Sequence, residues 1–363
     1  MAVRRLPSDP KKSAALIGLR YVNCNTAGFR RKRSGAGFSY LDLEGHPIKD
    51  KKVIQRIQSL ALPPAWESVW ICPLDEGHLQ AIGTDARGRR QYRYHPHYRL
   101  LRNHTKFHKM LDFAAALPKI RAHVERDLKL PSLNREKVVA TVVSLLETTS
   151  IRVGNEEYAR DNSSFGLTTL RDRHVKIEGD QIRFRFRGKS AQFHEITVQD
   201  KRMARIVREC RDLPGYELFQ YLDEYGETHS IDSSDVNSYL QKVSGSAFTA
   251  KDFRTWAGTV QTALALAEIG EFSSETEAKR NIVAAIKRTA SHLGNRPATC
   301  RNYYVHPAIL DAYMDGTLLR SITPPEEPHT GAETSLYPEE ECVVSIIRKR
   351  APGLIESVTI AAA

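Results

Sequence analysis

The front of the chain has the two-residue alternation of β-strands, whereas the rest has helical spacing. Loose alternation of apolar and polar side chains predicts a strand at 38–43, and two more strands are predicted at 68–72 and 79–84. The segment 85–94 is predicted to be a glycine turn that leads into a fourth strand. This fourth strand places Tyr92 and Tyr94 on one face and Arg93 on the other. A short helix is predicted between them, over 50–60. We therefore predict a small N-terminal domain with an antiparallel sheet, residues 1–98.

The remainder of the chain reads as amphipathic helices around one small hairpin sheet. Asn134 can cap a helix with an apolar face of valines and leucines, and Thr249 can cap another. Further helices are predicted at 199–211, 233–243, 275–292 and 306–314. Strands of the hairpin sheet are predicted at 175–177, 182–186 and 193–198. The predicted fold class is α+β, with a larger, mainly α-helical domain over 99–318 and a flexible, acidic tail over 319–363. A linker at 323–330 opens that tail.

The net charge of +11 is concentrated rather than interspersed. Basic residues clearly outnumber acidic ones in 1–94, whereas acidic residues prevail in 316–363. This distribution favours a body that binds nucleic acid, with a solvated basic surface as the alternative. The run F-R-R-K-R at 29–33 is predicted to be a flexible arm that lies along phosphates, or else a solvated loop.

The cysteines, the histidines and the hydropathy of the chain indicate its cellular compartment and whether it binds a metal. Five cysteines are scattered, with no C-x-x-C pair, so they indicate neither a disulfide framework nor a zinc site and fit a reducing cytoplasm. No apolar run reaches eighteen residues and the N-terminus has no signal-peptide core, so neither a membrane span nor secretion is expected. Four histidines come in two close pairs, His95 with His97 and His104 with His108. No third ligand accompanies either pair, so no metal or other cofactor is expected.

Separated arginines, one lysine and a late tyrosine are the groups needed to attack a phosphodiester without a metal. Arg152 in I-R-V-G-N-E-E-Y and Arg254 in K-D-F-R-T-W can hold phosphate oxygens with a fixed, permanently charged fork. Lys189, in the polar loop F-R-G-K-S, can protonate a poor alkoxide leaving group. Tyr303 or Tyr304 can be the nucleophile if nearby cations stabilise the phenolate.

In this order the motifs resemble the type IB DNA topoisomerases, in their poxvirus-like and bacterial branch. The family's I-R-x-G-x-x-x-Y, G-K and K-D-x-R-T segments match 151–158, 188–189 and 251–255. The family has a His or Asn nine residues before its nucleophile, and Asn295 stands nine before Tyr304. This spacing selects Tyr304, and we expect Tyr303 to point away into packing. The resemblance covers about residues 15–315.

The resemblance implies that Tyr304 forms a 3′-phosphotyrosyl bond, that the cut strand swivels to relax supercoils, and that religation needs neither ATP nor a metal. It assigns Arg152, Arg254 and Asn295 to the phosphate oxygens and Lys189 to the 5′-oxygen. Residues implied to contact DNA are Arg89, Arg90, Gln91, Tyr92, Tyr158 and Lys251. Lys251 can also relay a proton to Lys189. The expected partner is double-stranded DNA in the bacterial nucleoid, held by a monomer whose two lobes form a C-shaped clamp.

One departure and two alternatives accompany this interpretation. Ser190 follows the lysine where the viral enzymes have an acid, so the cleavage-site preference is expected to differ. A tyrosine recombinase shares the chemistry, but it usually has a His-x-x-Arg motif where Lys251 precedes Arg254 here, and its N-terminal domain is helical. A DNA-binding protein without activity would leave the tyrosine and arginines unexplained. Relaxation of a supercoiled plasmid in EDTA separates the three.

Overall fold

The chain divides into two compact units that share two long helices. The computed structural model describes residues 9–323 and 335–362, except for the side chains of 103–108 and 351–362. One unit comprises residues 1–108 with 351–363, and the other comprises 109–350. Helix α3 (Pro96–Asp127) and helix α12 (Pro338–Ala362) each contribute to both units. The predicted boundary at residue 98 therefore falls just inside α3.

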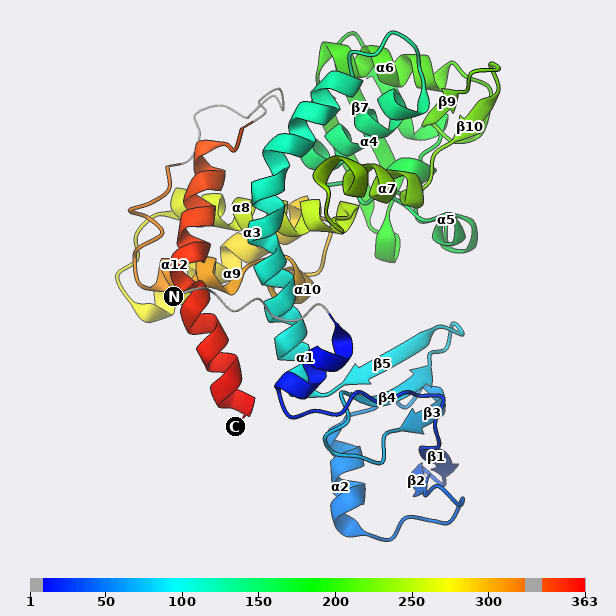
Figure 1. The fold of residues 1–363 in the computed structure, drawn as a ribbon, viewed down its shortest axis with the longest axis vertical. Helices are drawn as coiled ribbons and strands as arrows, with labels where there is room; N and C mark the ends of the chain where they lie inside the picture. The colour runs from blue at the N-terminus through cyan, green and yellow to red at the C-terminus, as the bar shows by residue number, and fades with distance from the viewer. Residues whose placement is uncertain (1–8, 324–334, 363) are drawn as a thin grey trace. The chain divides into compact units, whose positions relative to one another are not determined.

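The first unit is built on an antiparallel sheet with the strand order β2-β1-β3-β4-β5 (Figure 1). Its strands are β1 (Phe29–Ser34), β2 (Gly37–Leu41), β3 (Glu67–Ile71), β4 (Leu79–Thr84) and β5 (Arg90–Tyr94). Its two shorter helices are α1 (Pro10–Leu16) and α2 (Lys51–Ser59). Ile57 of α2 forms a buried cluster with Val69, Ile71 and Ala81 of the sheet. The predicted N-terminal antiparallel sheet is confirmed.

The basic run at 29–33 is a strand, so the prediction of a flexible arm was wrong. As β1 it pairs with both β2 and β3, near the middle of the sheet. Arg31 turns inward, donates to the carbonyl of Trp66 at 2.6 Å and lies 4.2 Å from the ring centre of Phe38. The neighbouring basic side chains remain exposed. Arg33 lies on the same face as Arg31 but is exposed, so the inward position of Arg31 follows from the carbonyl acceptors near Trp66 and not from strand alternation alone.

The second unit is mainly helical and is organised around α4 (Arg135–Thr149) (Figure 1). Its other helices are α5 (Glu156–Asn162), α6 (Lys201–Arg211), α7 (Ser233–Ser244), α8 (Ala250–Ile269), α9 (Glu275–His292), α10 (Pro297–Tyr303) and α11 (Pro307–Met314). Ten of the fifteen residues of α4 are buried, and the helix contacts α6, α7 and α8. The two predicted caps are present: Asn134 accepts the N–H of Lys137 at 3.0 Å, and Thr249 forms a capping box with Asp252.

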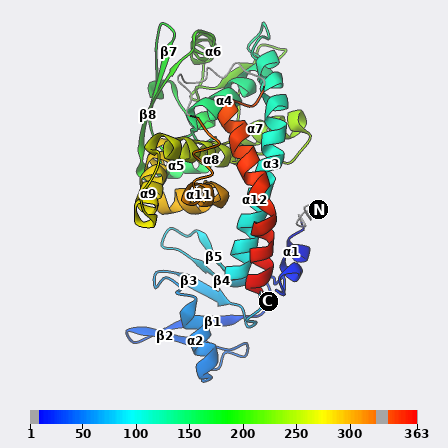
Figure 2. The ribbon, with the colours of Figure 1, turned by 90° about the vertical axis from the view of Figure 1, so that its left-hand side faces the viewer.

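Two small sheets complete the second unit. The three-stranded sheet contains β6 (Val175–Glu178), β7 (Gln181–Arg187) and β8 (Phe193–Gln199), as predicted. The other is a short hairpin that was not predicted, β9 (Gln220–Leu222) with β10 (Thr228–Ser230). In the antiparallel ladder of β7 and β8, visible as a long hairpin in Figure 2, Phe186 lies opposite His194. A tight turn joins the two strands, and Lys189 lies in it.

The C-terminal segment is packed where the sequence predicted a flexible tail. In both views α12 lies alongside α3 (Figures 1 and 2). Val343, Ile346 and Ile347 are buried, and buried Glu340 pairs with buried Arg121 of α3 at 3.0 Å. The tail prediction is therefore wrong for 335–350, because net acidity concealed a helix with one apolar face. The predicted linker lies, apart from its first residue, outside the described residues. No described helix, α12 included, is long and apolar enough to span a bilayer.

Candidate active site

Tyr304 lies immediately after α10, with its backbone held against α8. Its N–H donates to the carbonyl of Cys300 at 2.9 Å, which closes the last helical turn. A Cβ placed on Gly258 of α8 would lie 2.6 Å from the Tyr304 carbonyl oxygen and 3.1 Å from its Cβ. The hydroxyl of Thr259 lies 3.3 Å from the same carbonyl oxygen and accepts the N–H of His306 at 3.1 Å. This close approach fixes the position of the Tyr304 backbone.

The two adjacent tyrosines have different surroundings. The guanidinium carbon of Arg254 lies 5.5 Å from the ring centre of Tyr304. Tyr303 is 43% exposed, so the expectation that it points into packing was wrong. That expectation assumed a continuing helix, but α10 ends at Tyr303 and the backbone of Tyr304 leaves the helical region. The ring of Tyr304 thus lies beside the charge of Arg254.

Arg254 is one of two buried arginines among the described residues, with 4% of its surface exposed. Its guanidinium donates to the carbonyl of Ser150, at the end of α4, and to the carbonyl of Leu293 at 2.6 Å. Burial and the charge of Arg152 lower the pKa of Arg254 to about 10, so it keeps its charge at neutral pH. Two backbone carbonyls therefore orient this charge beside Tyr304.

Arg152 and Asn295 form the second half of the site. The Nη2 of Arg152 donates to the Oδ1 of Asn295 at 2.5 Å and to the carbonyl of Gly294 at 3.0 Å. Burial lowers the pKa of Arg152, whereas the phenol of Tyr304 acts in the opposite direction. Segments that lie far apart in the sequence, after α4, on α8 and after α9, thus bring four of the predicted catalytic residues together.

Two buried nitrogen atoms at this place have no hydrogen-bond partner within the described structure, the Nε of Arg254 and the Nδ2 of Asn295. Leaving a buried donor unpaired costs about 1–3 kcal/mol, more for a charged group. Both atoms are donors: one belongs to the guanidinium of Arg254, and the other to an amide whose oxygen accepts from the guanidinium of Arg152. An anionic acceptor such as a phosphate oxygen is the ligand that would satisfy both.

Lys189 lies in the turn between β7 and β8, and it is exposed along with the two residues after it. Ser190 and Ala191 have φ angles of 63° and 62°, in the left-handed region. The turn is closed by the N–H of Gly188, which donates to the carbonyl of Gln192 at 2.7 Å. The lysine is therefore presented on a defined turn, as the hairpin pattern predicted.

Sequence reasoning missed His194, whose ring lies next to this site. A Cβ on Gly188 would lie 2.7 Å from its Cδ2, and a Cβ on Gly294 would lie 2.2 Å from its Cε1. The ring also stacks on Phe186, with 5.1 Å between centroids and 14° between planes. Burial first, and then the charges of the two site arginines, lower the pKa of His194 to about 4. The available signal was its place on the inward face of a predicted strand, five residues after the lysine.

The residues predicted to contact DNA fall on both units. On the second, Tyr158 of α5 is 40% exposed and Lys251 is exposed in the first turn of α8. On the first, Arg90 and Tyr92 lie on the exposed face of β5. Tyr92 stacks on the neighbouring tyrosine of that face, with 6.1 Å between ring centroids.

Arg89 and Gln91 are held by Asp85 rather than being free on the surface. The Oδ2 of Asp85 accepts from Arg89 at 2.7 Å and from Gln91 at 2.9 Å. The hydrogen bond from Arg89 lowers the pKa of Asp85 to about 2, so the carboxylate is ionised at all working pH values. The exposed face of β5 therefore offers Arg90 more directly than Arg89.

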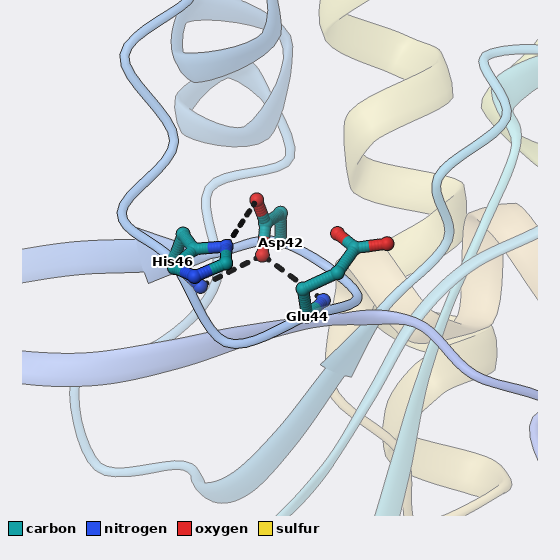
Figure 3. A group of neighbouring side chains, drawn as sticks. All are labelled: Asp42, Glu44 and His46. Carbon is teal, nitrogen blue, oxygen red and sulfur yellow. Dashed lines mark hydrogen bonds and ion pairs between the residues drawn. The ribbon is translucent and has the colours of Figure 1, made fainter.

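Within the described part of the chain, one group of side chains is close enough together to hold a metal ion: Asp42, Glu44 and His46 (Figure 3). The backbone N–H groups of Glu44 and His46 donate to the Oδ1 of Asp42 at 3.0 and 2.8 Å. An aspartate that accepts backbone N–H groups of the following residues is a common turn motif, and it accounts for this cluster. The side chains of His104 and His108, considered from the sequence, lie outside the described residues. The rings of His95 and His97 pack edge to face.

Comparisons with known proteins agree with this geometry. Residues 95–317 match the family described as eukaryotic DNA topoisomerase I, catalytic core, and residues 37–85 match the bacterial DNA topoisomerase IB, N-terminal domain. The chain is 34% identical over 295 residues to DNA topoisomerase 1B of Acanthamoeba polyphaga mimivirus, covering 79% of this chain and 88% of the relative. It is 27% identical over 244 residues to DNA topoisomerase 1B of Vaccinia virus, covering 66% and 73%.

The chain belongs to the type IB DNA topoisomerases. The resemblance drawn from the motifs is confirmed, and the recombinase alternative is set aside. As a member of this family the chain is an isomerase that acts on DNA topology. The match to the catalytic core ends at residue 317, so α12 lies beyond it.

Proposed function

We propose that this type IB topoisomerase cuts one strand of duplex DNA with Tyr304, lets that strand swivel, and reseals it. The observation that carries the proposal is the meeting of Tyr304 with Arg152, Arg254 and Asn295 around two unpaired buried donors. Tyrosines and arginines alone are common. Buried donors without an acceptor are rare, and their position beside a tyrosine indicates a binding site for an anion much more specifically.

In the proposed step the phenol of Tyr304 gives up its proton to water and its oxygen bonds to phosphorus, while the bond from phosphorus to the 5′-oxygen of the next nucleotide breaks. An unperturbed tyrosine has a pKa of about 10, so its phenolate needs cations nearby, and Arg254 supplies one. Charge that builds on the non-bridging oxygens is met by Arg152, Arg254 and the Nδ2 of Asn295. Reversal of the same step reseals the strand, because the phosphotyrosyl ester keeps the bond's energy. Neither ATP nor a metal is required.

The leaving 5′-oxygen takes up a proton as the bond to phosphorus breaks. We assign that proton to Lys189, whose exposed turn between β7 and β8 can reach into a bound duplex. Lys251, exposed at the start of α8, is the proposed relay. Ser190 beside the lysine is uncharged, so we expect a cleavage-site preference unlike that of enzymes with an acid there.

Binding of the duplex is proposed to use both units. Arg90 and Tyr92 on the exposed face of β5, with Tyr158 and Lys251 on the second unit, are the proposed backbone contacts. We further propose that the protein acts as a monomer that closes around DNA as a clamp. The match of its N-terminal part to a bacterial domain family supports a place in the bacterial nucleoid.

The test is relaxation of a supercoiled plasmid in EDTA, with covalent adducts trapped by denaturation. The wild type should relax the plasmid without ATP, and Tyr304→Phe should form no adduct while it still binds DNA. Tyr303→Phe is the matched control and should keep most of the activity, since its ring is half-exposed. Adducts that survive in Tyr304→Phe would move the nucleophile elsewhere and refute the assignment.

A further inference from the structure

The ring of His194 is inserted between two backbone segments that carry proposed catalytic groups. On one side it touches Gly188, which directly precedes Lys189, and on the other it touches Gly294, which directly precedes Asn295. Ideal Cβ atoms at these glycines would lie 2.7 Å from Cδ2 and 2.2 Å from Cε1 of the ring. No Cβ fits at such distances, so the imidazole edge occupies the space that any other residue would need.

The segment on the Asn295 side is fixed independently of the histidine. The carbonyl of Gly294 accepts from Arg152 at 3.0 Å, and the N–H of Asn295 donates to the carbonyl of Ala290 at 2.8 Å. The φ of Gly294 is +57°, which glycine adopts without strain. This turn is therefore a stable support for whatever packs on it.

The lysine turn depends more on such a support. Lys189, Ser190 and Ala191 are all exposed, and the last two have left-handed backbone angles. The base of the turn is defined by the ladder in which Phe186 lies opposite His194, with their rings stacked. His194 thus belongs to the hairpin through its strand, and to the Asn295 turn through its ring edge.

We propose that His194 is a positioning residue that holds the Lys189 turn against the Asn295 turn, so that the general acid and the phosphate-binding amide meet one phosphodiester. This inference rests on the proposed function. The ring acts by shape and not by proton transfer. Burial and the charges of the two arginines keep its pKa near 4, so it is neutral at neutral pH.

Removing the His194 ring should therefore reduce the rate at which Lys189 protonates the leaving 5′-oxygen. His194→Ala leaves a gap between the two glycine segments, and the exposed turn can move into or away from it. A misplacement of about 1 Å costs on the order of 10²-fold in rate. The phosphate-binding groups stay in place, because hydrogen bonds from Arg152 and to Ala290 hold the Asn295 turn without the histidine.

A substrate with a 5′-phosphorothiolate at the cut site separates these contributions, because a thiolate leaves without a proton. Single-turnover cleavage of this DNA and of normal DNA is measured for His194→Ala, Lys189→Ala and Arg254→Ala. The matched control is Thr197→Ala, an exposed position on the same strand. We expect His194→Ala to be about 10²-fold slow on normal DNA and close to wild type on the phosphorothiolate. Lys189→Ala should behave alike, whereas Arg254→Ala should stay slow on both.

Equal slowing of His194→Ala on both substrates would show general damage and overturn the inference, as would a wild-type rate on normal DNA. If the alanine variant does not fold, His194→Gln keeps a planar polar group in the slot and should show a smaller loss with the same rescue. Wild-type protein that forms no adduct with either substrate would instead refute the proposed function, so the two failures are distinguishable.

Discussion

Gly258→Ala should disable cleavage while leaving the protein folded, because α8 and Tyr304 meet at this glycine. The added Cβ would lie 2.6 Å from the Tyr304 carbonyl oxygen and 3.1 Å from both its Cβ and the Cδ1 of Leu293. Two of these three contacts are to the backbone and Cβ of Tyr304, which cannot rotate away as a side-chain end can. The segment that carries the nucleophile must therefore move.

The size of the movement follows from the contact distances. Ordinary carbon contacts begin near about 3.5 Å, so the carbonyl must retreat by somewhat under 1 Å. Alanine gains about 1 kcal/mol over glycine in a helix, and overpacking costs about 1–3 kcal/mol, so the net loss of stability is small. A nucleophile misplaced by about 1 Å loses on the order of 10²-fold in rate, equivalent to about 2.7 kcal/mol of barrier. Catalysis should thus suffer more than folding.

The measurement is single-turnover formation of the covalent adduct, with thermal unfolding and DNA affinity recorded on the same samples. Gly37→Ala is the matched control, since a Cβ there meets nothing closer than 4.0 Å. We expect adduct formation to fall about 10²-fold in Gly258→Ala at nearly unchanged DNA affinity. A wild-type cleavage rate would refute the argument that α8 sets the position of Tyr304.

Two further predictions concern the C-terminal segment and the DNA-binding surface. Glu340→Ala should lower the free energy of unfolding by about 1–3 kcal/mol in a urea titration, whereas exposed Glu341→Ala should change little. The variant leaves buried donors of Arg121 and Trp256 without an acceptor, although Glu147 still pairs with the Arg121 charge. A loss below about 1 kcal/mol would show that the Arg121 charge is satisfied without it. DNA affinity should fall with salt at a log–log slope near −0.9 per phosphate contact, and Arg90→Ala should reduce the slope by about one contact for most sequences alike. Arg89→Ala should reduce it less, because Asp85 already holds that side chain, and salt-independent binding would contradict the proposed backbone contacts.

Most of the secondary structure could be predicted because the local pattern decides it. The strand at 79–84 has the predicted bounds, and the caps at Asn134 and Thr249 begin the helices they were expected to begin. Both are local signals, a two-residue period or a side chain that bonds its own helix. The order of the five strands, by contrast, depends on pairing between distant segments, which no local pattern specifies.

Two errors came from judging segments by their charge. The run at 29–33 has one inward arginine that finds three backbone carbonyls, and only the folded loop around Trp66 creates those acceptors. The acidic C-terminus likewise places Glu340 on buried Arg121, a partner more than two hundred residues earlier. Charge predicted exposure in both cases, and tertiary partners reversed it.

The sequence could predict which residues form the site, but it could not predict how they are arranged in space. Motif order identified Arg152, Arg254 and Asn295, and the structure brings them together with Tyr304. Their catalytic roles stay predictions. Sequence spacing could not reveal His194. Its ring fits beside Gly188 and Gly294, which come from distant segments and lack the Cβ that would otherwise overlap it.

Helix α8 connects the site to the C-terminal helix through its two faces. Arg254 and Gly258 are four residues apart and so share one face, which meets Tyr304. Trp256, two residues from each, points to the opposite side, where its Nε1–H donates to the Oε1 of Glu340 at 2.7 Å. One face of α8 therefore contacts Tyr304, and its opposite face contacts α12. Helix α12 lies outside the matched catalytic core. Changes in α12 should for this reason alter the stability of the second unit together with the placement of Arg254.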